Sequence, residues 1–185
     1  DGRLLAPANH LDADGRLATV DGPASTWRYE YDAAGTRVAV ERDGIRTHYV
    51  VNPFAGPNSV VAEYDDSGTL IARYVHGMGL ACRIDGVTGG RYYYDFDVMG
   101  STVGLTGPDG RYVNTYRYLP FGEPLMKTEA VPNPFQYIGR FGVMRDGNGL
   151  DYMRMRYYQP TRGQFLRADP SRIHTLELYA YAGNN

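Results

Sequence analysis

The chain has 185 residues, among them 17 tyrosines, 23 glycines and 11 prolines, and its net charge at pH 7 is −2. Glycine and proline recur so often that a long helix, a coiled coil and a helical bundle are excluded. A transmembrane helix is excluded as well, since it needs about 20 apolar residues in a row. The slightly negative charge argues against nucleic acid as the main partner. Aromatic segments separated by turn formers predict an all-β protein.

A short unit recurs along the chain: an aromatic run, then Asp-x-x-Gly, then alternating apolar and polar residues. The unit occurs at 12–15, 32–35, 65–68 and 97–100. Aspartate at the first position of a type I turn bonds its own backbone, and glycine at the fourth position accepts the left-handed conformation that closes a hairpin. The repeat therefore predicts β-hairpins of roughly 20 residues, with extra turns at Asp43-Gly44 and Asp85-Gly86.

The strands of these hairpins are predicted from alternating apolar and polar residues beside each turn. In chain order they are expected at 27–31 with 36–42, at 60–64 with 69–74, and at 91–95 with 101–105, followed by a strand at 111–119 after the turn at 108–110.

The pattern loosens in the last third of the chain. We expect a loop over 120–134 and strands at 135–141, at 150–158 and, after a turn at 159–163, at 164–168. In the strand 150–158, Met153, Met155 and Tyr157 are expected to share one face. For 175–181 we favour a short helix over a strand.

Three ordered stretches make the chain resemble a known family. They are 94–102 (Tyr-Asp-Phe-Asp-Val-Met-Gly-Ser-Thr), 116–124 (Tyr-Arg-Tyr-Leu-Pro-Phe-Gly-Glu-Pro), and 154–170 followed by 178–185, which ends in Tyr-Ala-Gly-Asn-Asn. Together with the Tyr-Glu-Tyr-Asp-x-x-Gly units, they resemble the YD repeats and the Rhs repeat-associated core domain of Rhs proteins. Toxin-complex C components and teneurins carry similar repeats.

The resemblance implies an all-β fold in which a strip of YD-repeat hairpins forms part of a hollow spiral shell. Residues 1–90 would be shell wall, and residues 91–185 would be the core domain that plugs one end. A polymorphic toxin usually follows the core and is held inside. The chain opens at Asp1 in a turn-like sequence, so we expect a C-terminal segment of a longer shell, with an exposed edge and weak stability or oligomerisation by itself.

Asp169 is the sharpest candidate for chemistry. By the resemblance, it matches the first Asp-Pro of an aspartic autoprotease that releases the toxin. Such a protease needs two carboxylates that share a proton, and the family's second aspartate would lie downstream of Asn185. The usual Gly-Leu after this motif is missing, since the chain reads Asp169-Pro-Ser-Arg-Ile173. The alternative is that Asp169-Pro170 only begins a turn. We therefore expect no enzyme in this chain alone, with self-cleavage as the alternative for the parent protein.

Arg167 lies nearest to Asp169 among the five arginines of the last third. It is the candidate to orient Asp169 or the scissile carbonyl, although packing of arginine on tyrosine along a strand is the simpler explanation.

No cofactor or metal is expected, because His10, His48, His76, His174 and Cys82 lack metal-ligand spacing and no nucleotide-binding fingerprint occurs. Cys82 also has no second cysteine with which to form an internal disulfide. The expected partners are the rest of the shell, the following toxin or cargo polypeptide, and secretion machinery, at a secreted or cell-surface location. A surface module that binds glycans through its tyrosines is a further alternative.

Overall fold

The computed structural model describes residues 8–54 and 59–168 of the chain. Within them it contains sixteen strands and one short 3-10 helix, so the expected all-β class is confirmed. Contacts between residues divide the chain into two compact units, Asp1–Tyr93 and Tyr94–Asn185. In the part of the chain that the structure describes, no helix is both long and apolar enough to cross a membrane.

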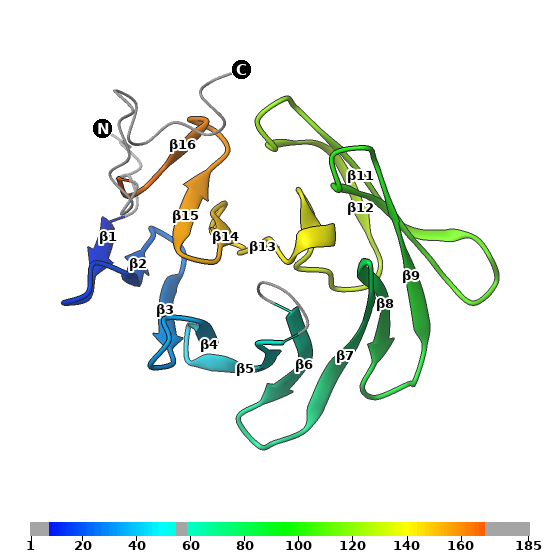
Figure 1. Ribbon diagram of the computed structural model, residues 1–185, viewed down its shortest axis with the longest axis horizontal. Helices are drawn as coiled ribbons and strands as arrows, with labels where there is room; N and C mark the ends of the chain where they lie inside the picture. The colour runs from blue at the N-terminus through cyan, green and yellow to red at the C-terminus, as the bar shows by residue number, and fades with distance from the viewer. Residues whose placement is uncertain (1–7, 55–58, 169–185) are drawn as a thin grey trace. The chain divides into compact units, whose positions relative to one another are not determined.

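Twelve strands form one sheet whose spatial order is the sequence order (Figure 1). They are β1 (Ala8–Leu11), β2 (Leu17–Asp21), β3 (Thr26–Tyr31), β4 (Arg37–Arg42), β5 (Ile45–Asn52), β6 (Ser59–Asp65), β7 (Leu70–Gly77), β8 (Gly79–Asp85), β9 (Arg91–Phe96), β10 (Thr102–Thr106), β11 (Tyr112–Tyr118) and β12 (Pro124–Glu129). All three predicted strand pairs are present, as β3 with β4, β6 with β7, and β9 with β10.

The Asp-x-x-Gly turns have the predicted geometry, which is clearest between β3 and β4. The Gly35 amide donates to the Asp32 carbonyl at 3.0 Å, and the Asp32 amide donates to the Thr36 carbonyl at 2.9 Å. The Asp32 carboxylate accepts from the amides of Ala34 and Thr36 at 2.9 and 2.8 Å. Gly35 has a φ of 81°, and the register shifts beside the turn, as expected for a type I turn closed by a glycine bulge.

Unit 1 buries charged groups together with its tyrosines. Arg37 is 2% exposed, and its guanidinium lies 5.6 Å from the ring centre of Tyr29 and 5.4 Å from that of Tyr49. Glu63 accepts a hydrogen bond from the Tyr74 hydroxyl at 3.0 Å, and burial raises the pKa of its carboxyl. Stacking of arginine on tyrosine is therefore a packing device of this sheet.

The expected loop over 120–134 is wrong in part, because β12 occupies Pro124–Glu129 and pairs with β11. All six residues of β12 are exposed, so the segment has none of the apolar alternation from which strands are recognised. Pro124 is tolerated as the first residue of an edge strand.

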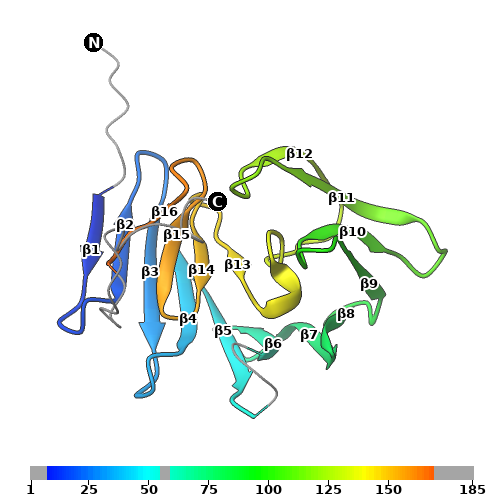
Figure 2. The same cartoon turned by 45° about the horizontal axis from the view of Figure 1, so that its top comes forward.

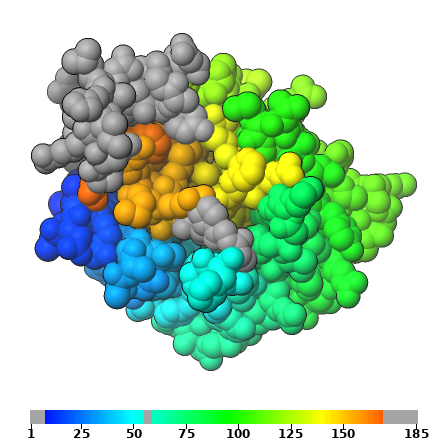
Figure 3. Space-filling model, viewed as in Figure 1, coloured from blue at the N-terminus to red at the C-terminus, as the bar shows by residue number. Residues whose placement is uncertain are grey.

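The expected strand over 135–141 is also wrong. This segment runs into the 3-10 helix η1 (Gly139–Phe141), which is entered through Ile138 with a φ of 52°. Its backbone bonds β10 and the turn before it: the Thr102 amide donates to the Gln136 carbonyl at 2.9 Å, and the Arg140 amide donates to the Gly100 carbonyl at 3.0 Å. In the space-filling view η1 (yellow) reaches the surface (Figure 3), where Phe141 is 53% exposed.

The expected single strand over 150–158 is instead a hairpin. A second sheet has the order β13 (Met144–Arg145), β14 (Asp151–Met153), β15 (Arg156–Gln159) and β16 (Gln164–Phe165), and Figure 2 shows its last three strands side by side. Arg154 turns the chain with a φ of 57°, and Met155 is exposed in this turn while Tyr157 is buried. The three side chains expected on one face are therefore separated. The expected helix at 175–181 lies outside the described residues.

Candidate functional site

Asp169 lies outside the described residues, so its role as a catalytic carboxylate stays a prediction. Arg167 follows β16 and is half-buried; its orienting role also stays a prediction. Nearby, the Arg156 guanidinium lies 3.6 Å from the ring centre of Phe165, which is the packing use of arginine. Across residues 8–54 and 59–168, no three His, Cys, Asp or Glu side chains are grouped as metal ligands would be.

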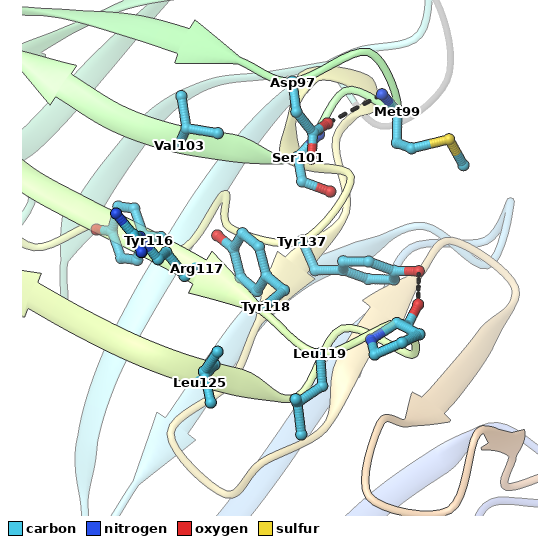
Figure 4. A pocket seen from close by; sticks show the side chains of 11 residues that line it. Asp97, Met99, Ser101, Val103, Tyr116, Arg117, Tyr118, Leu119, Leu125 and Tyr137 are labelled. Carbon is cyan, nitrogen blue, oxygen red and sulfur yellow. Dashed lines mark hydrogen bonds between the residues drawn. The ribbon is translucent and has the colours of Figure 1, made fainter.

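The candidate site is a surface pocket of unit 2 with a volume of about 480 Å³ (Figure 4). Its lining residues are Asp97, Met99, Ser101, Val103, Tyr116, Arg117, Tyr118, Leu119, Pro120, Leu125 and Tyr137. Eight of them belong to the two stretches 94–102 and 116–124 that resemble family motifs. Two of the three stretches that carry the resemblance therefore meet around one cavity, which has the size of an ordinary ligand pocket.

One wall of the pocket is the turn Leu119–Gly122. The Gly122 amide donates to the Leu119 carbonyl at 2.8 Å, and Gly122 has a φ of 85°. A Cβ atom on Gly122 would lie 2.5 Å from ring atoms of Tyr137. Glycine is thus required twice, for its left-handed backbone and for the close approach of the tyrosine ring.

Three side chains from later in unit 2 hold this turn by its backbone carbonyls. The Tyr137 hydroxyl donates to Pro120 at 3.4 Å, and the Tyr158 hydroxyl donates to Phe121 at 2.9 Å. Arg145 Nη2 donates to the Gly122 carbonyl at 3.1 Å. The second sheet thereby fixes the position of the pocket wall.

Arg145 is itself held by a buried ion pair with Asp151. Its Nε and Nη2 atoms lie 2.8 and 3.2 Å from the two carboxylate oxygens, and Asp151 is 0% exposed. Burial raises the pKa of Asp151 to about 6, although the Arg145 charge opposes this rise. The pair is well bonded, but the ionised carboxylate is costly to keep in this environment.

The opposite wall is the Asp-x-x-Gly turn that begins at Asp97. The Asp97 carboxylate accepts from the amides of Met99 and Ser101 at 2.9 and 2.8 Å. The Ser101 hydroxyl oxygen accepts from the Ile138 amide at 3.1 Å. The polar groups of this wall are therefore engaged mainly in holding the backbone.

Tyrosine rings form the centre of the pocket. Tyr118 stacks on Tyr116 with ring centres 6.4 Å apart and tilts against Tyr137 at 5.9 Å. The Tyr118 hydroxyl donates to the Thr102 carbonyl at 2.9 Å, and the Tyr116 hydroxyl donates to Glu129 at 2.7 Å. Burial raises the pKa of both phenols, so they stay neutral. The pocket offers apolar ring faces rather than reactive groups.

Sequence reasoning missed the pocket and the Arg145–Asp151 pair. One signal was available: the turn between β13 and β14 is a fifth Asp-x-x-Gly unit, in which the Gly149 amide donates to the Asp146 carbonyl at 3.1 Å. This unit divides the region into a hairpin and places Asp151 at the start of a strand beside buried Leu150.

No family model matches the chain, but it is similar to several bacterial nucleases and toxin subunits and to salivary gland surface protein 1 of Aedes aegypti. It is 30% identical over 188 residues to the tRNA nuclease WapA of Bacillus subtilis, a match that includes 94% of this chain and 8% of WapA. It is 30% identical to the probable deoxyribonuclease RhsB of Dickeya dadantii, over 94% of this chain and 12% of RhsB. Toxin subunit YenC1 of Yersinia entomophaga is 34% identical over 51% of this chain and 10% of YenC1.

Solved structures agree on the fold. A crystal structure of TcdB2–TccC3 superposes with a TM-score of 0.77 over 96% of this chain and 10% of that chain, at 21% identity. The Photorhabdus luminescens Tc holotoxin pore gives a TM-score of 0.71 over 97% of this chain and 10% of that chain, at 19% identity. The chain thus spans roughly a tenth of the length of the proteins it matches.

Proposed function

Because the chain belongs to the Rhs and YD-repeat family of toxin-complex proteins, we propose that it is the C-terminal structural part of a shell that encloses or presents a following toxin polypeptide. Residues 1–90 would contribute shell wall, and residues 91–185 would contribute the core domain. The expected partners are the rest of the shell, the cargo and the secretion machinery, at a secreted or cell-surface location. The names of the relatives support a toxin as the cargo, since they include nucleases and toxin subunits.

The observation that carries this proposal is the strictly sequential order of β1 to β12. Each inner strand bonds the strand before it and the strand after it, so the sheet is a strip that grows by adding hairpins. Among the described residues this strip has two edges, β1 and β12, whose backbone groups can pair with a further strand. A strip of this kind is suited to form wall rather than a self-contained enzyme.

Protection of cargo from protease tests the proposal. The parent polypeptide, with the chain and the sequence that follows it, is incubated with proteinase K, and the survival of the following segment is measured by mass spectrometry. We expect the segment to survive much longer than the same segment expressed alone. Equal digestion rates would contradict the proposal. Parent protein unfolded in urea and diluted into the assay is the control, because it contains the same peptide bonds without the enclosure.

At this pocket the glycan-binding alternative has less support. Sugar recognition needs polar groups that are free to bond hydroxyls beside an aromatic face, whereas the phenols of Tyr116, Tyr118 and Tyr137 all donate within the protein. Binding of the chain to a glycan array, lost when Tyr118 is replaced by alanine, would favour that alternative instead.

A further inference from the structure

The rim of the pocket exposes large apolar side chains to solvent. Met99 is 63% exposed, Leu119 41% and Leu125 64%, and all three line the same cavity. Phe121 and Met126, next in sequence to lining residues, are exposed as well. Apolar side chains grouped around a pocket mark a surface that binds another molecule, and methionine suits surfaces that accept varied sequences.

A strand edge adjoins this rim. β12 has β11 as its single hydrogen-bonded neighbour in the described part of the chain, and all of its residues are exposed. Leu125 belongs both to β12 and to the lining of the pocket. Backbone groups that can pair with an extended segment therefore lie directly beside a cavity that can hold a side chain. Recognition by strand addition uses this combination: the backbone gives affinity and the pocket gives selectivity.

We propose that the pocket and the free edge of β12 dock an extended segment of the cargo polypeptide, which inserts one large apolar side chain between Tyr118, Leu119 and Leu125. This inference rests on the proposed function. An extended polypeptide is favoured over a small ligand because β12 offers backbone groups to pair. An apolar side chain is favoured over a sugar or an anion because the phenols are engaged and the lining holds one acidic and one basic residue, Asp97 and Arg117.

Binding of labelled peptides to the parent polypeptide from which the cargo segment has been deleted tests the site. The probe is dye-labelled Thr-Val-Trp-Val-Thr, blocked at both ends, and binding is followed by fluorescence anisotropy. Thr-Val-Ala-Val-Thr removes the large side chain, and Thr-Pro-Trp-Pro-Thr removes two backbone donors but keeps the tryptophan. We expect each control peptide to bind about tenfold more weakly or worse. Equal affinity of the tryptophan and alanine peptides would overturn the proposal.

A matched pair of variants locates the site. Leu125 and Met155 are both 64% exposed, but Met155 is absent from the pocket lining. We expect Leu125→Asp to weaken binding of the tryptophan peptide about tenfold and Met155→Asp to leave it unchanged, with both circular dichroism spectra like wild type. Equal effects of the two substitutions on peptide binding would show that the peptide does not bind at this pocket.

Two other occupants are distinguished by the same materials. If Thr-Pro-Trp-Pro-Thr binds as tightly as Thr-Val-Trp-Val-Thr, the pocket takes an apolar group without strand pairing, and strand addition is refuted. If light scattering shows a dimer that Leu125→Asp separates, a second copy of the chain occupies the edge and the cargo assignment is refuted.

Hydrogen exchange in the parent polypeptide connects the site to the cargo. We expect amides of 125–129 to exchange about tenfold more slowly when the cargo segment is present than when it is deleted. Cargo that resists protease without slower exchange at 125–129 would refute the docking site and leave the shell function intact. Cargo that is digested freely would contradict the shell function itself.

Discussion

Replacing Arg145 by methionine should destabilise unit 2 strongly, because Asp151 would remain as an unpaired buried charge. The substitution keeps most of the apolar stem but removes the two hydrogen bonds to the carboxylate, at 2.8 and 3.2 Å, and the bond to the Gly122 carbonyl at 3.1 Å. Removing one partner of a buried ion pair costs about 3–5 kcal/mol. We expect a loss in this range at pH 7.

The titration of Asp151 determines how the stability of the folded chain should change with pH. The pKa of Asp151 in the folded chain is about 6, above its ordinary value of 3.8. Because its pKa is higher in the folded than in the unfolded chain, the protonated carboxyl stabilises the folded state. This stabilisation is complete at a pH below the pKa of the unfolded chain and is lost as the pH rises through the pKa of the folded chain. Relative to Asp151→Asn, the wild-type chain should therefore gain up to about 3 kcal/mol between pH 7 and pH 4. The cost of Arg145→Met should shrink as the pH falls toward about 6, because without the Arg145 charge the pKa of Asp151 lies higher still and the carboxyl becomes neutral earlier in the variant than in the wild type.

Hydrogen exchange of the peptide 144–159, which contains Arg145 and Asp151, measures the loss of stability caused by Arg145→Met. Tryptophan fluorescence is unsuitable, because the single tryptophan, Trp27, lies in unit 1. The control is Arg28→Met, which removes an ion pair with Glu41 at 3.0 Å whose arginine side chain is 64% exposed and should cost less than about 1 kcal/mol. A cost of Arg145→Met below about 1 kcal/mol at pH 7, or one that is the same at pH 5 and pH 8, would refute the reasoning.

Three further predictions concern the turns and the candidate catalytic residue. Gly110 has a φ of 77° with nothing within 4 Å of a new Cβ, so Gly110→Ala should lower the free energy of unfolding by about 1–2 kcal/mol. Gly122→Ala should lower it clearly more, as measured by urea unfolding, because its Cβ would meet a tyrosine ring. Equal losses would contradict the role of that contact. Asp32→Ala should lower the free energy of unfolding by about 0.5–2 kcal/mol, because two hydrogen bonds to the backbone are lost. Asp32→Asn should keep most of this stability, and the fluorescence of Trp27 during unfolding measures both changes. If the parent polypeptide cleaves itself, Asp169→Asn should abolish that cleavage in mass spectrometry, and unchanged cleavage would remove Asp169 from any catalytic role.

The hairpins could be predicted from the sequence because the residues that form each turn are neighbours in the chain. The hydrogen bonds that close the turn at Asp32 lie within five consecutive residues, and the Asp-x-x-Gly pattern alone reveals such a turn. The same reasoning failed at Arg154, where a residue with no special preference for turns adopts a φ of 57°. It failed at β12 as well, because a strand without buried residues has no alternation to detect.

The pocket could not be predicted because its parts are distant in sequence. Ile138 takes a left-handed conformation at the start of η1, where its amide bonds Ser101 at 3.1 Å across 37 residues. Tyr158 reaches the Phe121 carbonyl across the same separation. These contacts depend on tertiary packing, which overrides local preference, and the sequence shows only the motifs that become the walls.

The strictly consecutive antiparallel order of β1 to β12 also restricts how this sheet can change in length. Gaining or losing a complete hairpin leaves every later strand with its original direction, and the self-contained turns require no compensating change elsewhere. Gaining or losing a single strand would reverse the direction of all strands that follow and move their turns to the opposite rim of the sheet. Natural variants of this sheet should therefore differ by even numbers of strands.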